Sequence, residues 1–125
     1  MRNLLFLVVP ILTMLVLLPF SVSADPSIPL ASGAYVFQHR FAEQPDMQGT
    51  PLRVTIHGSH IVIVNPEAAG PFPAGIIAEG RLMWHARSGQ WIIGHKATDR
   101  KARNVGGCSG GPEVVDLAYR VYWTC

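Results

Sequence analysis

Residues 52–65, with the sequence LRVTIHGSHIVIVN, decide the fold prediction. Two runs rich in β-branched residues, 52–57 and 60–65, are separated only by Gly58 and Ser59. A two-residue connection with glycine first is typical of a type II′ turn, whose twist matches that of the strands it joins. We therefore predict a β-hairpin, with Ile56 opposite Ile61, Val54 opposite Ile63, Thr55 opposite Val62 and His57 opposite His60.

Five further runs with the composition or alternation of strands flank this hairpin. They are residues 35–41, 76–79, 82–87, 91–94 and 113–125. Gly80 predicts a bend or bulge between two of these runs. Ser88-Gly89 predicts a second two-residue hairpin, with Trp84 opposite Ile93 and Ala86 opposite Trp91. About seven short antiparallel strands without βαβ spacing predict an all-β fold, a small antiparallel barrel or sandwich.

Irregular segments separate the predicted strands. Residues 43–50 and 65–74 contain proline and glycine, and residues 106–112 form a glycine-rich link. Residues 96–103 fit either a single helical turn capped by Thr98 or a loop. Because loops on a rigid scaffold commonly carry recognition, we expect partner contacts in segments 43–50, 65–74 and 96–103.

The first 24 residues have the pattern of a signal peptide. Arg2 precedes an almost continuously apolar stretch, residues 4–20, and Val22-Ser23-Ala24 offers small residues at a cleavage site. The alternative is an uncleaved anchor, since the apolar stretch is at the short end of the range that spans a bilayer. Cleavage predicts an exported protein, periplasmic or secreted, with a flexible lead-in at residues 25–32 and a single β domain at residues 33–125.

Charge argues against some classes of partner. The chain has ten lysines and arginines and eight acidic residues. Loss of Arg2 with the signal peptide leaves a net charge of about +1. Nucleic-acid binding draws on clustered positive charge, so we predict no nucleic-acid partner. The same balance gives no attraction to an anionic membrane, and we expect no membrane contact after signal cleavage.

The two cysteines of the chain, Cys108 and Cys125, are expected to form a structural disulfide. Thiols in an oxidising compartment tend to pair, and this spacing differs from the Cys-x-x-Cys of redox proteins. The bridge would close a loop of about 18 residues and stabilise the fold by about 3 kcal/mol. It would also hold the C-terminal end of the chain.

Residues 107–112, GCSGGP, carry the one resemblance to a known family. The segment resembles the nucleophile loop of chymotrypsin-like serine proteases, Gly-Asp-Ser-Gly-Gly-Pro, with Cys108 in place of the aspartate. The resemblance implies Ser109 as a nucleophile beside an oxyanion hole. The chain has no Ala-Ala-His-Cys segment to supply the base, and the loop also fits a hinge beside a disulfide. We therefore predict no catalytic residues and no enzymatic activity.

Histidines offer a metal-binding alternative. His57 and His60 are expected to point the same way across the first hairpin, and imidazoles are ligands for zinc or copper. A site usually needs three or four ligands, and His39, His85 and His95 lie elsewhere in the sequence. Histidines beside an exposed turn are also ordinary surface residues. We predict no cofactor and keep a metal site at His57 and His60 as a remote alternative.

Basic and aromatic side chains are the remaining candidates for binding. Lys96, Arg100, Lys101 and Arg103 form the one basic concentration and fit an acidic partner or a phosphate, or a solvated loop. Aromatic residues fall on the predicted strands, where they form a core or line a pocket for an apolar ligand. They are Tyr35, Phe37, Phe41, Trp84, Trp91, Tyr119 and Trp123.

These observations lead to two functional hypotheses. The first is a small exported protein-binding module without catalytic activity, such as an inhibitor or an immunity-type factor. Its contacts would include Phe72 and the basic segment. The second is a carrier of a small apolar ligand inside a β-barrel, with Trp84, Trp91 and Trp123 near the ligand.

Overall fold

The computed structural model describes residues 14–19 and 24–125. The predicted signal peptide therefore lies mostly outside the described residues. Residues 14–19 form no helix or strand. Within the described part of the chain, no helix has the length and apolar character needed to cross a membrane.

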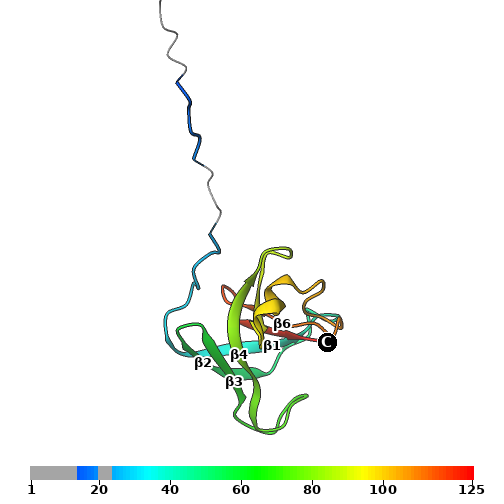
Figure 1. The fold of residues 1–125 in the computed structure, drawn as a ribbon. Coiled ribbons are helices and arrows are strands. Elements are labelled where there is room, and N and C mark those ends of the chain that lie inside the picture. The colour runs from blue at the N-terminus through cyan, green and yellow to red at the C-terminus, as the bar shows by residue number, and fades with distance from the viewer. Residues whose placement is uncertain (1–13, 20–23) are drawn as a thin grey trace, which may run out of the picture.

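Seven strands form one closed barrel in which each strand neighbours the next along the chain (Figure 1). They are β1 (Gly33–Phe41), β2 (Pro51–His57), β3 (His60–Asn65), β4 (Gly75–His85), β5 (Gln90–Gly94), β6 (Glu113–Asp116) and β7 (Val121–Thr124). The barrel closes where β1 pairs in parallel with β7, and the other neighbouring pairs are antiparallel. An odd number of alternating strands leaves the first and the last running the same way. The predicted all-β fold is confirmed, and of its two alternatives, barrel and sandwich, the structure has the barrel.

The hairpin of β2 and β3 has the predicted register. Ile56 pairs with Ile61, and His57 pairs with His60. Gly58 has a φ of 60° and Ser59 a negative one, as a type II′ turn requires. The inward side chains of both strands are buried and alternate with more exposed ones. Here the local turn chemistry and the burial of one face favour the same register.

The hairpin of β4 and β5 differs from the prediction by two residues. Trp84 pairs with Trp91, and His85 pairs with Gln90, so that four residues rather than two form the loop. Gly89 has a φ of 66°, and its N–H donates to the carbonyl of His85. A shift of two residues keeps every side chain on its predicted face. The error therefore changed cross-strand partners and not burial.

Two of the predicted strand boundaries are wrong. The runs on either side of Gly80 form the single strand β4, which pairs with β3 through Arg81 and with β5 from Arg81 onward. A Cβ at Gly80 would lie 2.7 Å from the carbonyl oxygen of Gly94, so the glycine allows a close approach of β5 rather than ending the strand. The β-bulge lies between Ile63 and Val64 instead.

The C-terminal run is two strands and not one. β6 ends at Asp116, whose Oδ1 accepts a hydrogen bond from the N–H of Tyr119. Arg120 then adopts a φ of 57°, and β7 returns antiparallel to β6. Leu117 remains buried although it lies in the turn. In the sequence, apolar residues continue to alternate with others through residues 117–120. This alternation predicted one continuous strand and gave no sign of the turn.

The segment after β5 contains the short 3-10 helix η1 (Ala97–Lys101), as one of the two predicted alternatives. Thr98 is not its cap. The carboxylate of Asp99 accepts hydrogen bonds from the N–H groups of His95 and Lys96, and these bonds lower the pKa of Asp99, with the His95 bond contributing most. Asp99 fits this role because its side chain reaches back over one turn.

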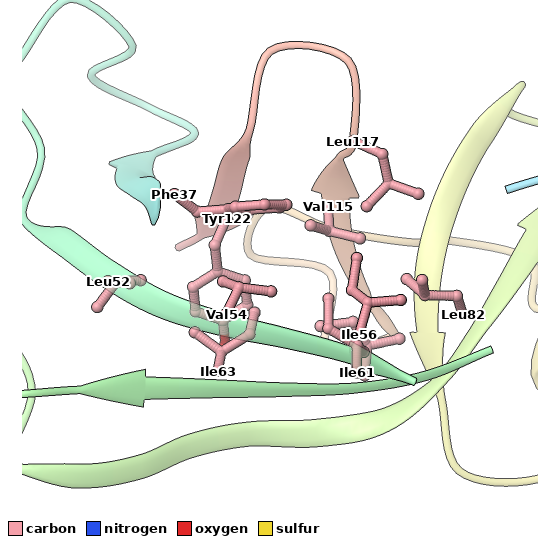
Figure 2. Close-up of a cluster of buried hydrophobic side chains, with 11 residues drawn as sticks. Phe37, Leu52, Val54, Ile56, Ile61, Ile63, Leu82, Val115, Leu117 and Tyr122 are labelled. Carbon is pink, nitrogen blue, oxygen red and sulfur yellow. The ribbon is translucent and has the colours of Figure 1, made fainter. Parts of the chain in front are cut away.

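Side chains from all seven strands, together with one residue of the β6–β7 turn, fill the barrel interior (Figure 2). They are Phe37, Leu52, Val54, Ile56, Ile61, Ile63, Leu82, Ile93, Val115, Leu117 and Tyr122. Each is at most 3% exposed. A smaller cluster of Met83, Ile92 and Val114 packs on the outer side of the sheet with Val105 and Trp123.

The lead-in and the loop after β3 pack at opposite ends of the barrel. Ile28 and Leu30 pack against the core, and Ser32 accepts a hydrogen bond from the N–H of Gly58. At the other end lies Phe72, whose ring contacts those of His39 and Tyr122. The C-terminus lies on the side away from the lead-in (Figure 1).

Candidate binding site

The three tryptophans of the chain line one surface groove. Trp84 comes from β4, Trp91 from β5 and Trp123 from β7, and all three are partly exposed. Pro29 of the lead-in and Ala118 of the β6–β7 turn complete its rim. We call this feature, with about 190 Å³ of space, the tryptophan groove. Its other lining residues are Gly89, Gln90, Val114, Val115, Asp116 and Leu117.

Packing below the groove holds the tryptophans in place. The rings of Trp84 and Trp91, which pair across β4 and β5, meet edge to face with centroids 5.4 Å apart. Trp91 also packs against the interior cluster, and Trp123 packs against the outer one. Each indole therefore has one side against the protein and another open to a ligand, which suits recognition because little side-chain freedom is lost on binding.

A second hollow gathers positive charge beside η1. Its lining includes Arg81 from β4 and three residues that follow β5, His95, Lys96 and Arg100. Two of the predicted basic residues, Lys96 and Arg100, are thus brought together, whereas Lys101 and Arg103 do not line this hollow. Met83, Gly94 and Ala97 complete the lining. We call this feature, with about 230 Å³ of space, the basic hollow.

His57 and His60 are cross-strand neighbours, as expected, but Nε2 of His60 lies 3.1 Å from a carboxylate oxygen of Glu79. Among the described residues, one group of three potential metal ligands comes together, Glu43 with Cys108 and Cys125. The two sulfurs of that group form the disulfide. The histidine pair therefore has one carboxylate neighbour and belongs to no such group.

Two other histidines are buried and hydrogen bonded. Nε2 of His85 lies 2.7 Å from the carbonyl oxygen of Ala102, and Nδ1 lies 2.7 Å from Oγ of Ser88. A carbonyl only accepts, so Nε2 of His85 donates to Ala102. His39 bonds Thr124 through Nε2, and burial lowers the pKa of His39. Both rings connect loops to the barrel.

Phe72, predicted as a contact residue, is partly buried against the core. The amide of Asn65 donates to the carbonyls of Ala69, Phe72 and Pro73, at 3.1 to 3.2 Å, and so holds the loop over the end of the barrel. The ring of Phe72 packs edge-on against His39 with centroids 4.7 Å apart. The position of Phe72 is explained by this packing without a partner.

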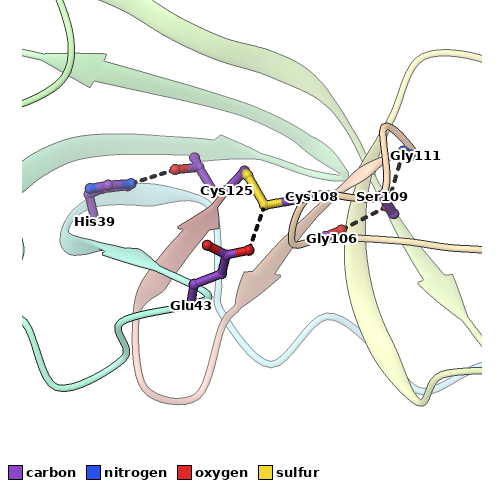
Figure 3. Close-up of a disulfide and its surroundings, with 8 residues drawn as sticks. His39, Glu43, Gly106, Cys108, Ser109, Gly111 and Cys125 are labelled. Carbon is purple, nitrogen blue, oxygen red and sulfur yellow. Dashed lines mark hydrogen bonds between the residues drawn. A yellow bond between two sulfur atoms is a disulfide. The ribbon is translucent and has the colours of Figure 1, made fainter.

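Cys108 and Cys125 form the predicted disulfide, with Cα atoms 4.7 Å apart (Figure 3). The hydroxyl of Ser109 donates to the carbonyl of Gly106 and accepts from the N–H of Gly111. Both hydrogen bonds are made to residues of the same glycine-rich link, which fits a hinge beside a disulfide. Ser109 thus orders its own loop.

Comparison of the chain with models of protein families, with curated proteins and with solved structures finds no match. The fold defines the class, a small closed β-barrel with a filled interior and one disulfide. Sequence reasoning had missed Pro29, Arg81 and Ala118 as lining residues. Only the three-dimensional packing of the lead-in, β4 and the β6–β7 turn brings them to the two hollows.

Proposed function

We propose that this protein is a small exported binding module without catalytic activity, an inhibitor or immunity-type factor that engages a protein partner. The observation that carries the proposal is the gathering of all three tryptophans in one surface groove. Tryptophan is enriched among the residues that dominate binding energy at protein interfaces. A segment of the partner would place an apolar side chain between Trp91 and Trp123.

Rigidity and charge support the same proposal. The interior is filled by side chains, and the disulfide ties the end of β7 to the preceding link, so recognition would use the outer surface. The basic hollow and the tryptophan groove both border β4 and β5. An apolar contact beside positive charge favours a partner with an acidic rim around an apolar side chain.

The test is to place a bulky charge in the groove without disturbing the core. Ala118 is exposed in the β6–β7 turn and lines the groove, so Ala118→Arg would obstruct it. Ala34→Arg is the matched control, because Ala34 is also exposed, lies on β1 and does not line the groove. Immobilised wild-type protein would retain a partner from the exported proteins of its source, and that partner would be purified for titration calorimetry.

We expect Ala118→Arg to weaken binding at least tenfold, whereas Ala34→Arg leaves the dissociation constant within about twofold of the wild-type value, since surface changes outside an interface contribute little. Equal binding by both variants would overturn the groove as the contact site. Recovery of a small apolar molecule that shifts tryptophan fluorescence, with no protein partner, would instead support ligand carriage.

A further inference from the structure

A carboxylate already lies beside the basic hollow, paired with one of its lining residues. Oδ2 of Asp25, in the lead-in, lies 2.8 Å from Nη1 of Arg100. The two residues are 75 positions apart in the sequence, and their side chains are 53% and 46% exposed. The other nearby carboxylate, that of Asp99, accepts from the N–H groups of His95 and Lys96. Asp25 is thus the acid that enters from a different part of the chain.

The lead-in connects the two hollows of the surface. Asp25 contacts Arg100 beside the basic hollow, and four residues later Pro29 lines the tryptophan groove. Between them, Ile28 packs against the core. An extended segment with an acidic residue and a proline or apolar residue about four positions later therefore matches the spacing of the two sites. The lead-in itself has this pattern.

We propose that the basic hollow binds an acidic side chain from an extended segment of the protein partner, and that this side chain displaces Asp25 from Arg100. The inference rests on the proposed function and identifies the chemistry of the partner. Arginine suits this role because its planar guanidinium matches a carboxylate. The resident ion pair is half-exposed and therefore weak, so a partner can replace it at little cost. Arg81 and Lys96 also line the hollow and add positive charge.

The experiment uses a synthetic peptide with the sequence of residues 25–30, Asp-Pro-Ser-Ile-Pro-Leu, capped at both ends. Binding to the whole exported protein would be followed by the tryptophan indole N–H signals in NMR titrations. Asp25→Asn removes the resident carboxylate and should tighten peptide binding about two- to fivefold, the range of an exposed ion pair. Arg100→Gln should weaken it at least fivefold, and Arg81→Gln should weaken it less.

Three controls decide the outcome. Arg53→Gln changes an exposed arginine of β2 outside both hollows and should leave the affinity unchanged. A peptide with asparagine in place of aspartate should bind at least fivefold more weakly. Inorganic phosphate should compete only weakly with the peptide, and competition at equal concentration would overturn the peptide assignment in favour of a general anion site.

Equal affinity of wild-type, Asp25→Asn and Arg100→Gln proteins for the peptide would also overturn the inference. That result is distinguishable from failure of the proposed function. If the peptide does not bind while Ala118→Arg still weakens binding of the purified partner at least tenfold, the tryptophan groove is supported as a contact site and only the acidic contact is overturned. If partner binding is insensitive to Ala118→Arg but the peptide binds as expected, the basic hollow stands alone.

Discussion

His39 is a buried base among aromatic rings. Its ring meets Phe41 and Phe72 edge-on and lies 6.1 Å from the centroid of Tyr122. Nε2 is 2.8 Å from Oγ1 of Thr124 near the end of β7. Burial disfavours the charged imidazolium, so the pKa of His39 lies below its ordinary value of 6.5. The neutral ring therefore joins β1, the loop carrying Phe72 and β7.

This burial predicts a pH dependence of folding. Well above pH 6.5 the ring is neutral in both the folded and the unfolded state, and its contribution to stability is fully present. As pH falls below 6.5 toward the lower folded pKa, the unfolded chain binds the proton more readily, and the free energy of unfolding decreases. The slope from this one group is at most about 1.4 kcal/mol per pH unit. Urea denaturation between pH 8 and 5 would measure it.

The His39→Gln variant isolates this contribution. It removes the titrating group, so its free energy of unfolding should depend less steeply on pH than that of the wild type. His57→Gln, at an exposed position of β2, serves as control and should keep the wild-type slope. Parallel pH profiles for the wild type and His39→Gln would contradict the assignment.

At the scale of elements, the strands were predictable where local pattern and burial agree. In β2 apolar residues alternate with polar ones, β3 is a run of isoleucine and valine, and a two-residue turn joins them. The predicted register is the observed one. Strand number was also right, although one predicted strand divides in two at residues 117–120 and two others merge across Gly80. Both errors arise because glycine and alternation report local geometry, whereas strand ends depend on pairing with neighbours.

The sequence identified several residues of the candidate site but not their arrangement in space. Trp84, Trp91 and Trp123 were identified from their strands, and Lys96 and Arg100 from the basic segment. Their arrangement into two hollows depends on barrel closure between β1 and β7 and on the docked lead-in. The contact predicted for Phe72 stays a prediction, and its sequence position in a proline-rich loop gave no sign of the Asn65 hydrogen bonds or of the packing of its ring against the core.

Asn65 provides a test at this scale, because its amide anchors the whole loop after β3. Its side chain is buried, and its N–H groups serve three carbonyls of that loop. Asn65→Ala leaves those acceptors unpaired and should lower the free energy of unfolding by about 1–3 kcal/mol. Asn65→Asp keeps the size of the side chain but places carboxylate oxygens against the three carbonyl oxygens. It should therefore lower the free energy of unfolding more than Asn65→Ala does.

Urea denaturation would give the free energies, and amide exchange of the non-proline residues in 69–75 would report loosening of the loop. Asn104→Asp is the matched control, since Asn104 is exposed and should tolerate the same change within about 0.5 kcal/mol. A variant Asn65→Asp as stable as Asn104→Asp would show that the three hydrogen bonds do not hold the loop.

The barrel is closed by its shortest strands. β6 and β7 have four residues each, and β7 supplies the parallel seam with β1. Cys125 directly follows β7, and the disulfide joins it to Cys108 in the link that precedes β6. Oε1 of Glu43 lies 3.4 Å from Sγ of Cys108, so a negative charge also stands beside the bridge. Without the disulfide, barrel closure would depend on the short β1–β7 pairing alone.

Replacement of both cysteines, Cys108→Ser with Cys125→Ser, should therefore lower the free energy of unfolding by about 3 kcal/mol, the loop-entropy value for a bridge of this span. Guanidinium denaturation would measure the loss. Because β7 closes the barrel, amide exchange should rise first in β7 and in the facing half of β1, while the β2–β3 hairpin keeps its protection. Glu43→Gln, which leaves the disulfide intact, should stay within about 0.5 kcal/mol of the wild type. Uniform loss of protection across all strands would mean that the bridge stabilises the barrel only through the unfolded chain and does not secure the seam.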